Sequence, residues 1–333
     1  MDDRRGFLGR VGAFTMGGAA GLLATSRPTL AQTSPSNYPY FNVKDFGATG
    51  GGSVNDKPAI DSAISAAAVN GGTVYFPQGT YLISSSISLP NWVALKGTGR
   101  GSEIIASPTF SSQQMFYAAN GTGSMFGSRL EDLSLNANDV AGIVAVVIAD
   151  AWQETCGAHR VVVRKFRNRG MLIRFGWGGA SWTRLSEIEL FGSSLGSGTG
   201  IDCQQVSCVG AFMLYVSGAS ICGDSAAYPL AVGIAVHQDS LIADTVHFEY
   251  CNYGINLGGQ GHSSLRGITG SYNNVGDIVA LESTFKGSVV LQAVNPNGAT
   301  ASYHDYGTGA VVTAPIPHFV VQKAATLECA SPP

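Results

Sequence analysis

Short apolar segments recur through most of this chain, and their spacing of about 20 to 30 residues constrains the fold more than any other feature. Each repeat holds an apolar segment, a polar or glycine-rich turn, and a second apolar segment that begins with glycine. These second segments begin at Gly142-Ile143, Gly170-Met171, Gly200-Ile201, Gly233-Ile234 and Gly254-Ile255, with Gly276-Asp277-Ile278 as a variant. Such a period is typical of solenoids, in which each repeat forms one coil and stacked coils bury a continuous core.

We therefore predict an all-β fold, a single-stranded right-handed parallel β-helix over residues 41–333. The repeated glycines are expected at sharp corners that require positive φ. A series of antiparallel hairpins is the alternative, but two-residue hairpin turns do not recur in the sequence. The 44 Gly and the low charged share of 12% agree with a β-rich body that has many tight turns.

An N-terminal cap is expected over about residues 41–105, and it contains the single predicted helix. The helix should run from about Lys57 to Val69, because Pro58 suits a first turn and an Asn-Gly-Gly sequence follows. Asn55 or Asp56 is its expected N-cap.

The same region carries a family resemblance. The stretch "VKDFGATGGGSVNDKPAIDSAISAAAVNGGTVYFPQGTYLI" resembles the opening of the pectate-lyase-like superfamily, which includes polygalacturonases, rhamnogalacturonases, exported polysaccharide lyases and phage tailspikes. The resemblance implies a right-handed parallel β-helix that this region starts and caps. The usual Asp, Thr and Asp are replaced here by Gly51, Val54 and Asn55. These replacements argue against a cation site near the cap, but they do not argue against the fold. The polygalacturonase motifs "NTD", "GHG" and "RIK" are absent, so none of their catalytic roles is carried over.

Residues 1–31 resemble a twin-arginine export signal. Arg4 and Arg5 precede a weakly apolar, Gly/Ala-rich run, and "TLA" ends at Ala31, the expected cleavage point. Residues 32–40 are the expected linker. We predict an exported bacterial protein, periplasmic or extracellular, without a membrane span, because no later stretch reaches about 18 apolar residues.

Charge and cysteine content exclude some partners. The formal net charge is -3 and no basic block occurs, which gives no support for nucleic-acid binding. No spacing of Cys or His indicates a metal site, and no cofactor is predicted. Export would permit disulfides, and Cys203 with Cys208 is the nearest pair, but buried free thiols are the equal alternative.

The candidate catalytic residues follow from strand alternation. In "DTVHFEY" the apolar Val246 and Phe248 should face the core, so His247 and Glu249 should face solvent. Asp244 begins the same strand and is a further candidate. The alternative for each is a solvated face, a partner on the next coil or, for Asp244, a turn cap.

A second carboxylate pair has the same pattern. In "SEIEL" the alternation directs Glu187 and Glu189 outward. If the strands stack in register, this pair lies two coils, roughly 10 Å, from His247 and Glu249. Opposed carboxylates roughly 6.5–9.5 Å apart suit inverting glycoside hydrolysis, so this spacing is at the upper edge of the useful range.

Other polar and aromatic residues near these strands could hold a sugar chain. Aromatic rings match the apolar face of a pyranose, and Trp152, Trp177 and Tyr253 are further candidates of this type. The predicted substrate-binding residues are Arg184, Tyr215, His237, His262, Arg266 and Trp182.

Three functions remain open on these residues, and the expected partner in each is a polysaccharide. The first hypothesis, which we rank above the second, is a glycoside hydrolase. The second is a polysaccharide lyase acting on a uronate polymer, with His247, Arg266 and Tyr215 as base and charge neutraliser. The third is a non-catalytic β-helix that binds glycan or builds an exported surface layer.

Overall fold

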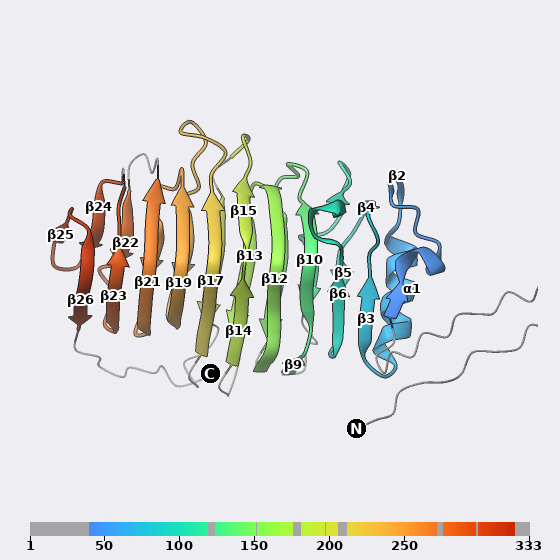
Figure 1. Ribbon diagram of the computed structural model, residues 1–333, viewed down its shortest axis with the longest axis horizontal. Helices are drawn as coiled ribbons and strands as arrows, with labels where there is room; N and C mark the ends of the chain where they lie inside the picture. The colour runs from blue at the N-terminus through green and yellow to red at the C-terminus, as the bar shows by residue number, and fades with distance from the viewer. Residues whose placement is uncertain are drawn as a thin grey trace, which may run out of the picture. The chain divides into compact units, whose positions relative to one another are not determined.

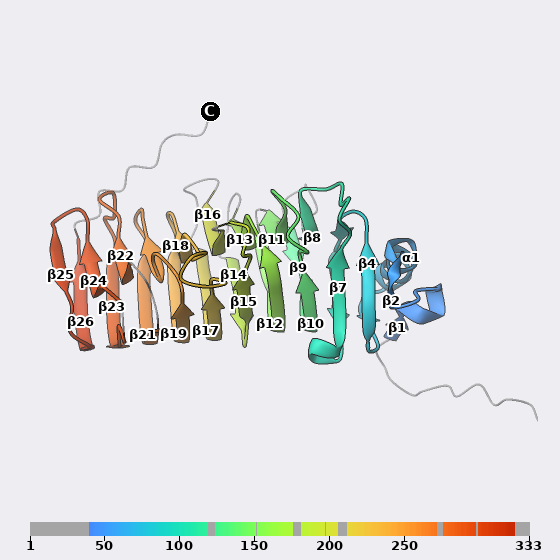
Figure 2. The ribbon, with the colours of Figure 1, turned by 90° about the horizontal axis from the view of Figure 1, so that it is seen from above.

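The computed structural model describes residues 40–118, 124–150, 152–175, 181–196, 198–205, 212–271, 276–297 and 299–323. These residues form one compact unit of stacked β coils (Figures 1 and 2). The predicted export signal of residues 1–31 and the linker lie outside the described residues, except for Tyr40. The prediction of an all-β parallel solenoid is confirmed.

Two sheets carry the strands, one of 16 strands and one of 10. The first sheet contains β1 (Tyr40–Asn42), β2 (Gly51–Asn55), β3 (Gly72–Tyr75), β4 (Gly79–Ile83), β6 (Val93–Lys96), β7 (Ser102–Ala106), β9 (Ser124–Phe126), β10 (Arg129–Asn136), β12 (Trp152–Phe166), β14 (Ser181–Ser186), β15 (Glu189–Gly192), β17 (Phe212–Cys222), β19 (Ser240–Glu249), β21 (His262–Ser271), β23 (Ser288–Val294) and β26 (Ile316–Gln322). The second contains β5 (Ile87–Ser88), β8 (Gln114–Ala118), β11 (Val144–Asp150), β13 (Arg169–Phe175), β16 (Thr199–Gln205), β18 (Val232–Val236), β20 (Ile255–Leu257), β22 (Asp277–Leu281), β24 (Ala301–Asp305) and β25 (Ala310–Val312).

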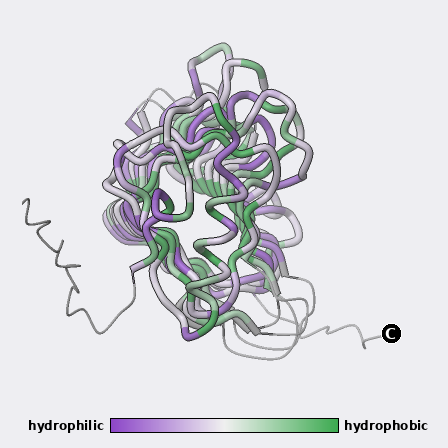
Figure 3. Tube along the Cα trace, turned by 90° about the vertical axis from the view of Figure 1, so that its right-hand side faces the viewer, coloured by the Kyte–Doolittle hydropathy of each residue, from purple (hydrophilic) through white to green (hydrophobic). Residues whose placement is uncertain are grey.

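Neighbouring coils pair in parallel, so each side chain lies above its counterpart on the next coil. Only β25 and β26, the last strands described, pair antiparallel, with β24 and β23. One apolar cluster runs through the interior from Val43 to Ile316. Viewed along the stack, the coils lie one behind another around this interior (Figure 3).

The long strands of the first sheet share a left-handed residue at one register position. In β19 this residue is Thr245, with φ 56°, between the outward Asp244 and the inward Val246. Equivalent positions on six other coils also have positive φ: Asp132, Arg160, Glu187, Gly218, Gly267 and Ala293. Each adds one outward residue and shifts the alternation, as a repeated β-bulge would.

This column of left-handed residues divides the outer face of the first sheet into two walls. We call the outward side chains of residues 129–131, 157–159, 182–186, 213–217, 240–244 and 262–266 the upstream wall. The downstream wall comprises the outward side chains of residues 189–191, 220–222, 247–249 and 269–271.

Gly142 has the predicted positive φ, 80°, but most of the repeated glycines have a different cause. Gly170, Gly200, Gly233 and Gly254 lie in one column, and none has positive φ. A Cβ on Gly200 would lie 2.5 Å from the carbonyl oxygen of Gly233. A Cβ on Gly233 would lie 2.4 Å from the ring of Phe248. Close packing between coils, and not a left-handed corner, therefore requires glycine here.

The helix α1 spans Lys57–Ala68 and confirms the predicted helix to within a residue. Its buried residues Ile60, Ala63, Ile64 and Ala67 join the apolar interior at the N-terminal end of the described stack (Figure 1). Asp56 is the N-cap residue, but its side chain makes no cap hydrogen bond. It accepts instead from the backbone nitrogens of Thr49, at 2.6 Å, and Gly50, at 3.1 Å. Two short 3₁₀-helices span Val43–Phe46 and Gly99–Gly101.

The left-handed column predicts a matched pair of stability effects. Gly218→Val should lower the free energy of unfolding by about 1–2 kcal/mol, because a β-branched residue is strained at positive φ. A Cβ there would have no atom nearer than 3.6 Å, so crowding contributes little. Ser217 is one residue earlier and is also exposed. Ser217→Val should change the free energy of unfolding by less than about 0.5 kcal/mol. Urea denaturation measures both, and equal effects would contradict the assignment of strain to this column.

Candidate functional site

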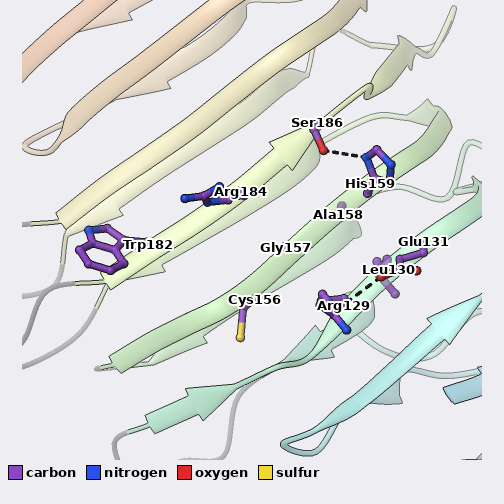
Figure 4. Close-up of a pocket in the computed structure, with 10 residues that line it drawn as sticks. All are labelled: Arg129, Leu130, Glu131, Cys156, Gly157, Ala158, His159, Trp182, Arg184 and Ser186. Carbon is purple, nitrogen blue, oxygen red and sulfur yellow. Dashed lines mark hydrogen bonds and ion pairs between the residues drawn. The ribbon is translucent and has the colours of Figure 1, made fainter. Parts of the chain in front are cut away.

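A groove of about 530 Å³ lies on the upstream wall, across β10, β12 and β14 (Figure 4). Its walls and floor come from three successive coils of the first sheet. The lining residues are Arg129, Leu130, Glu131, Cys156, Gly157, Ala158, His159, Trp182, Arg184 and Ser186. Trp182 and Arg184, both predicted to bind substrate, lie on this surface.

The hollow exists because Gly157 has no side chain where its neighbours have long ones. Gly157 is aligned with Arg129 on one side and Arg184 on the other. A Cβ at this position would lie 2.0 Å from the carbonyl oxygen of Arg184, and a register shift follows Glu154. Close approach of two coils therefore fixes the glycine, and the missing side chain leaves space between two arginines.

Two guanidinium groups border this space. The side chain of Arg129 is 53% exposed, and its Nε lies 3.5 Å from Glu131 Oε1. The Arg184 guanidinium lies over the ring of Tyr215, 5.2 Å from the ring centroid. Tyr215, another predicted substrate-binding residue, is thus brought next to the groove. The surface between the arginines suits an anionic ligand, since each guanidinium can pair with a carboxylate.

A column of polar side chains forms one edge of the groove. In register order it contains Lys96, Glu131, His159, Ser186, Ser217, Asp244 and Arg266. Burial alone would lower the pKa of Lys96, but hydrogen bonds and charges from Glu131 and Asp132 outweigh it and raise the pKa. Lys96 Nζ lies 3.3 Å from Glu131 Oε2, so this carboxylate is held by two cations.

His159 is held at both ring nitrogens. Its Nδ1 lies 2.8 Å from Ser186 Oγ (Figure 4), and its Nε2 contacts the guanidinium of Arg160. Arg160 also donates to both carboxylate oxygens of Asp132, at 2.5 and 3.0 Å. These hydrogen bonds lower the pKa of Asp132. The imidazole is therefore fixed in orientation at the edge of the groove, as general acid–base chemistry requires.

The predicted catalytic residues after the left-handed column lie on the downstream wall. The side chains of His247 and Glu249 face outward as expected, and His247 Nε2 lies 4.0 Å from Glu249 Oε1. His247 Nδ1 lies 3.0 Å from Thr269 Oγ1. Glu189 and His247 occupy one column two coils apart, which matches the expected register. Glu189 is paired with Arg100.

Three further candidates are divided between the column and the upstream wall. Glu187 is one of the left-handed residues and is exposed. Asp244 faces outward on the upstream wall and pairs with Arg266, and this pairing lowers the pKa of Asp244. His262 also lies on the upstream wall, with Nδ1 2.7 Å from Ser288 Oγ. The left-handed column thus separates Asp244 from His247.

His237 lies on the second sheet, away from the residues it was grouped with. Its Nε2 is 3.0 Å from Asp202 Oδ1, and this hydrogen bond raises the pKa of His237 against the effect of burial. Burial alone would raise the pKa of Asp202, but hydrogen bonds from His237 and Arg169 hold it below its ordinary value. This cluster, in which Asp202 is buried and His237 is exposed, is separate from the groove.

The remaining aromatic and cysteine predictions have mixed outcomes. Trp177 and the side chain of Trp152 lie outside the described parts of the structure. Tyr253 packs edge-on against Tyr306, with ring centroids 6.2 Å apart. Cys203 is a buried free thiol, so the bridge to Cys208 is not formed and the alternative of a free thiol holds at Cys203.

Sequence reasoning missed four polar groove residues: Arg129, Glu131, His159 and Ser186. The only available signal was the repeat itself, since "RLE" (129–131), "GAH" (157–159) and "RLS" (184–186) occupy the same place in successive coils. Among the described residues, no cluster of three or more His, Cys, Asp or Glu side chains could hold a metal ion. Within the same residues, no helix has the length and apolar character needed to span a membrane.

The fold and the groove define a parallel β-helix protein with a charged, solvent-facing cleft on one sheet. The chain belongs to the pectate-lyase-like family described as rhamnogalacturonase A/epimerase, whose model matches residues 40–280.

Individual relatives match over shorter stretches. Mannuronan C5-epimerase AlgE3 of Azotobacter vinelandii is 42% identical over 110 residues, which are 29% of this chain and 6% of the relative. Mannuronan C5-epimerase AlgE4 of the same organism is 41% identical over 110 residues, 29% of this chain and 20% of the relative. The match therefore spans a small part of the length of these curated relatives.

A solved structure supports the fold over most of the chain. The enzymatically active domain of tailspike protein 2 from bacteriophage CBA120 superposes with a TM-score of 0.51 at 16% identity. The superposition covers 83% of this chain and 45% of the tailspike chain. At this identity the likeness shows the β-helix fold alone.

Neutral substitutions of two buried aspartates, Asp239 and Asp202, should have opposite effects on the stability of the fold. Burial raises the pKa of Asp239 to about 7, and its carboxylate lies 3.7 Å from the Cys203 thiol. An unfolded Asp titrates near 3.9, so the folded protein loses stability as pH rises from about 4 to about 7. Asp239→Asn should remove this loss and be more stable than wild type above pH 7, by up to about 4 kcal/mol.

Asp202→Asn is the matched contrast. The lowered pKa of Asp202 contributes stability above the ordinary carboxyl range, and this stability is lost as pH falls through the lowered pKa. The variant should lose about 1–3 kcal/mol at neutral pH, because the partly exposed Arg169 and His237 lose their charge-assisted hydrogen bonds to Asp202. Denaturant titrations from about pH 3 to pH 9 measure both variants. A destabilised Asp239→Asn at high pH would contradict the assignment for Asp239.

Proposed function

We propose that this protein acts on an acidic polysaccharide that lies in the groove of the upstream wall. The observation that carries the proposal is the pair of arginines, Arg129 and Arg184, on either side of the space above Gly157. A uronate polymer presents a carboxylate on its sugar rings, and guanidinium groups pair with carboxylates. The exposed Trp182 adds an aromatic face for a sugar ring.

The chemistry we propose is removal of the proton α to the uronate carboxylate. This reaction needs a base and a cation that neutralises the acid. We assign the base to His159, whose Nε2 accepts the substrate proton after the Arg160 guanidinium, which also donates to Asp132, has turned away from it. The arginines neutralise the carboxylate. If the bond from C4 to the glycosidic oxygen then breaks, with a proton from solvent going to that oxygen, the reaction is that of a lyase. If solvent instead delivers a proton to C5 from the opposite face, and the proton on His159 passes to solvent, the reaction is that of an epimerase.

The similarities support this choice. The matched relatives are named mannuronan C5-epimerases, and mannuronan is a polymer of an acidic sugar. The family description also includes an epimerase. Among the described residues that line the groove, Glu131 is the sole carboxylate, and it is paired with Lys96 and Arg129. Two-carboxylate hydrolysis needs a second acidic group on the opposite side of the sugar bond.

Glycoside hydrolysis is the second candidate, located on the downstream wall. The observation that favours it is the shared column of Glu189 and His247, with Glu249 beside His247. A hydrolase would release reducing ends without forming an unsaturated uronide. A lyase would form new reducing ends and an unsaturated uronide. An epimerase would exchange the C5 proton with solvent without cleaving the chain.

His159→Gln removes the proposed base. On whichever uronate polymer the wild type acts, the variant should therefore have a kcat about 100- to 10,000-fold lower. His318→Gln on the distant β26 is the matched control and should have wild-type kcat. His247→Ala with Glu249→Gln tests the downstream wall. Ultraviolet absorbance of the uronide, reducing-end release and solvent-deuterium incorporation at C5 follow the three reactions. Loss of activity in the downstream double variant with full activity in His159→Gln would favour hydrolysis there.

Arg184→Gln and Arg129→Gln should each weaken binding of uronate oligomers by about 10- to 100-fold, because each removes a charge-assisted hydrogen bond. Binding of matched neutral oligosaccharides should not change. Calorimetric titration measures both, and equal losses for acidic and neutral chains would contradict the charge-pairing role.

We also propose that the protein is exported, as the Arg4-Arg5 segment predicts. Replacement of both arginines by lysine should keep the protein inside a bacterial host, because a twin-arginine signal requires the arginine pair. Cell fractionation measures the outcome, and undiminished export of the double variant would contradict this signal type.

A further inference from the structure

Trp92 combines an unusual backbone conformation with an exposed aromatic ring. It precedes β6, has φ 63° and is 60% exposed. A bulky residue in the left-handed region is strained and persists only where its surroundings enforce it. Because so much of the ring remains in water, burial of apolar surface gives a poor account of why tryptophan stands here.

The surroundings of Trp92 hold it in this conformation. Its backbone nitrogen donates to the carbonyl oxygen of Phe126 at 2.7 Å. A Cβ on Gly127 would lie 2.7 Å from Cε3 of the Trp92 ring, and a Cβ on Gly71 would lie 3.2 Å from its Cβ. Glycine on each neighbouring coil therefore makes room for this one side chain.

The Trp92 ring packs against that of Phe126. The centroids are 5.7 Å apart and the planes differ by 9°, so the two rings are nearly parallel. Phe126 is half-buried, which leaves an aromatic surface that is rigid and faces solvent. Aromatic pairs of this geometry are favoured beyond the area that they bury.

This aromatic pair is connected to the groove by the register of the first sheet. The backbone of Phe126 is aligned with Glu154, and Glu154 is aligned with Trp182. Phe126 and Trp182 thus lie in one column two coils, about 10 Å, apart. Phe126 also precedes Arg129 by three residues in the chain, so it lies next to the side of the groove that Arg129 forms. Figure 4 shows Trp182 and Arg129 on opposite sides of the Gly157 floor.

We propose that Trp92 and Phe126 form an additional sugar subsite, which stacks on the apolar face of one pyranose ring of the bound polymer. The inference rests on the proposed function, since the same uronate chain would run from Trp182 through the groove to this pair. The subsite is reached only by a chain longer than the groove itself. Trp92 therefore contributes to the preference for long oligomers and not to the chemical step.

The test measures affinity as a function of oligomer length. Mannuronate and galacturonate oligomers, short and long, are titrated calorimetrically into wild type, Trp92→Asn, Trp92→Tyr and Tyr228→Asn. Asparagine tolerates positive φ and preserves the fold without an aromatic ring. Tyr228, 46% exposed, is the matched aromatic control away from the groove. Circular dichroism checks that each variant is folded.

Trp92→Asn should weaken binding of long oligomers by about 2- to 10-fold and leave short ones unchanged, while Trp92→Tyr should stay within about 2-fold of wild type. Tyr228→Asn should bind like wild type at every length. In one outcome, binding depends on Arg129 and Arg184, but Trp92→Asn still prefers long oligomers as the wild type does. That outcome would overturn the subsite and leave the proposed function intact. Failure of wild type to bind any uronate oligomer would overturn both.

Discussion

Backbone pairing between successive coils is the interaction on which the rest of this structure depends. It repeats at about 4.8 Å and aligns every residue with one counterpart above and one below. Apolar columns such as that of Leu130, Ala158 and Leu185 become the interior in this way. Polar columns become continuous surfaces. Function in such a fold depends on which residues share a column, and only secondarily on their spacing along the chain.

The left-handed column decides how these polar surfaces are arranged. Each long strand adds an outward residue there, so Asp244 and His247 of one strand belong to different walls. The groove and its arginines lie on the upstream wall, whereas His247 and Glu249 lie on the downstream one. Both walls carry outward histidines hydrogen-bonded to hydroxyl groups, at His159, His247 and His262. The groove differs from the other surfaces because Gly157 leaves space between two cations.

Of the residues that line the groove, only Trp182 and Arg184 were predicted from the sequence, and the errors of the prediction have specific causes. The outward positions of His247, Glu249, Glu187 and Glu189 followed from alternation within their own short segments. Alternation could not predict the wall of Asp244, because nothing in the identity of Thr245 signals positive φ. His237 was placed with the groove residues although its strand belongs to the second sheet. The recurring glycines were predicted, but the predicted cause, positive φ, holds for Gly142 and not for Gly170, Gly200, Gly233 and Gly254, where contact between coils requires glycine.

The sequence by itself determined the solenoid, its N-terminal helix and the inward apolar faces, because these follow from period and alternation within short stretches. Tertiary structure alone decided that Arg129, His159 and Arg184 surround one hollow, and that Trp92 lies beyond its edge. Those residues are far apart in the chain and meet only through the register of separate coils. Register depends on loop lengths and bulges between coils, and a local pattern carries no information about either.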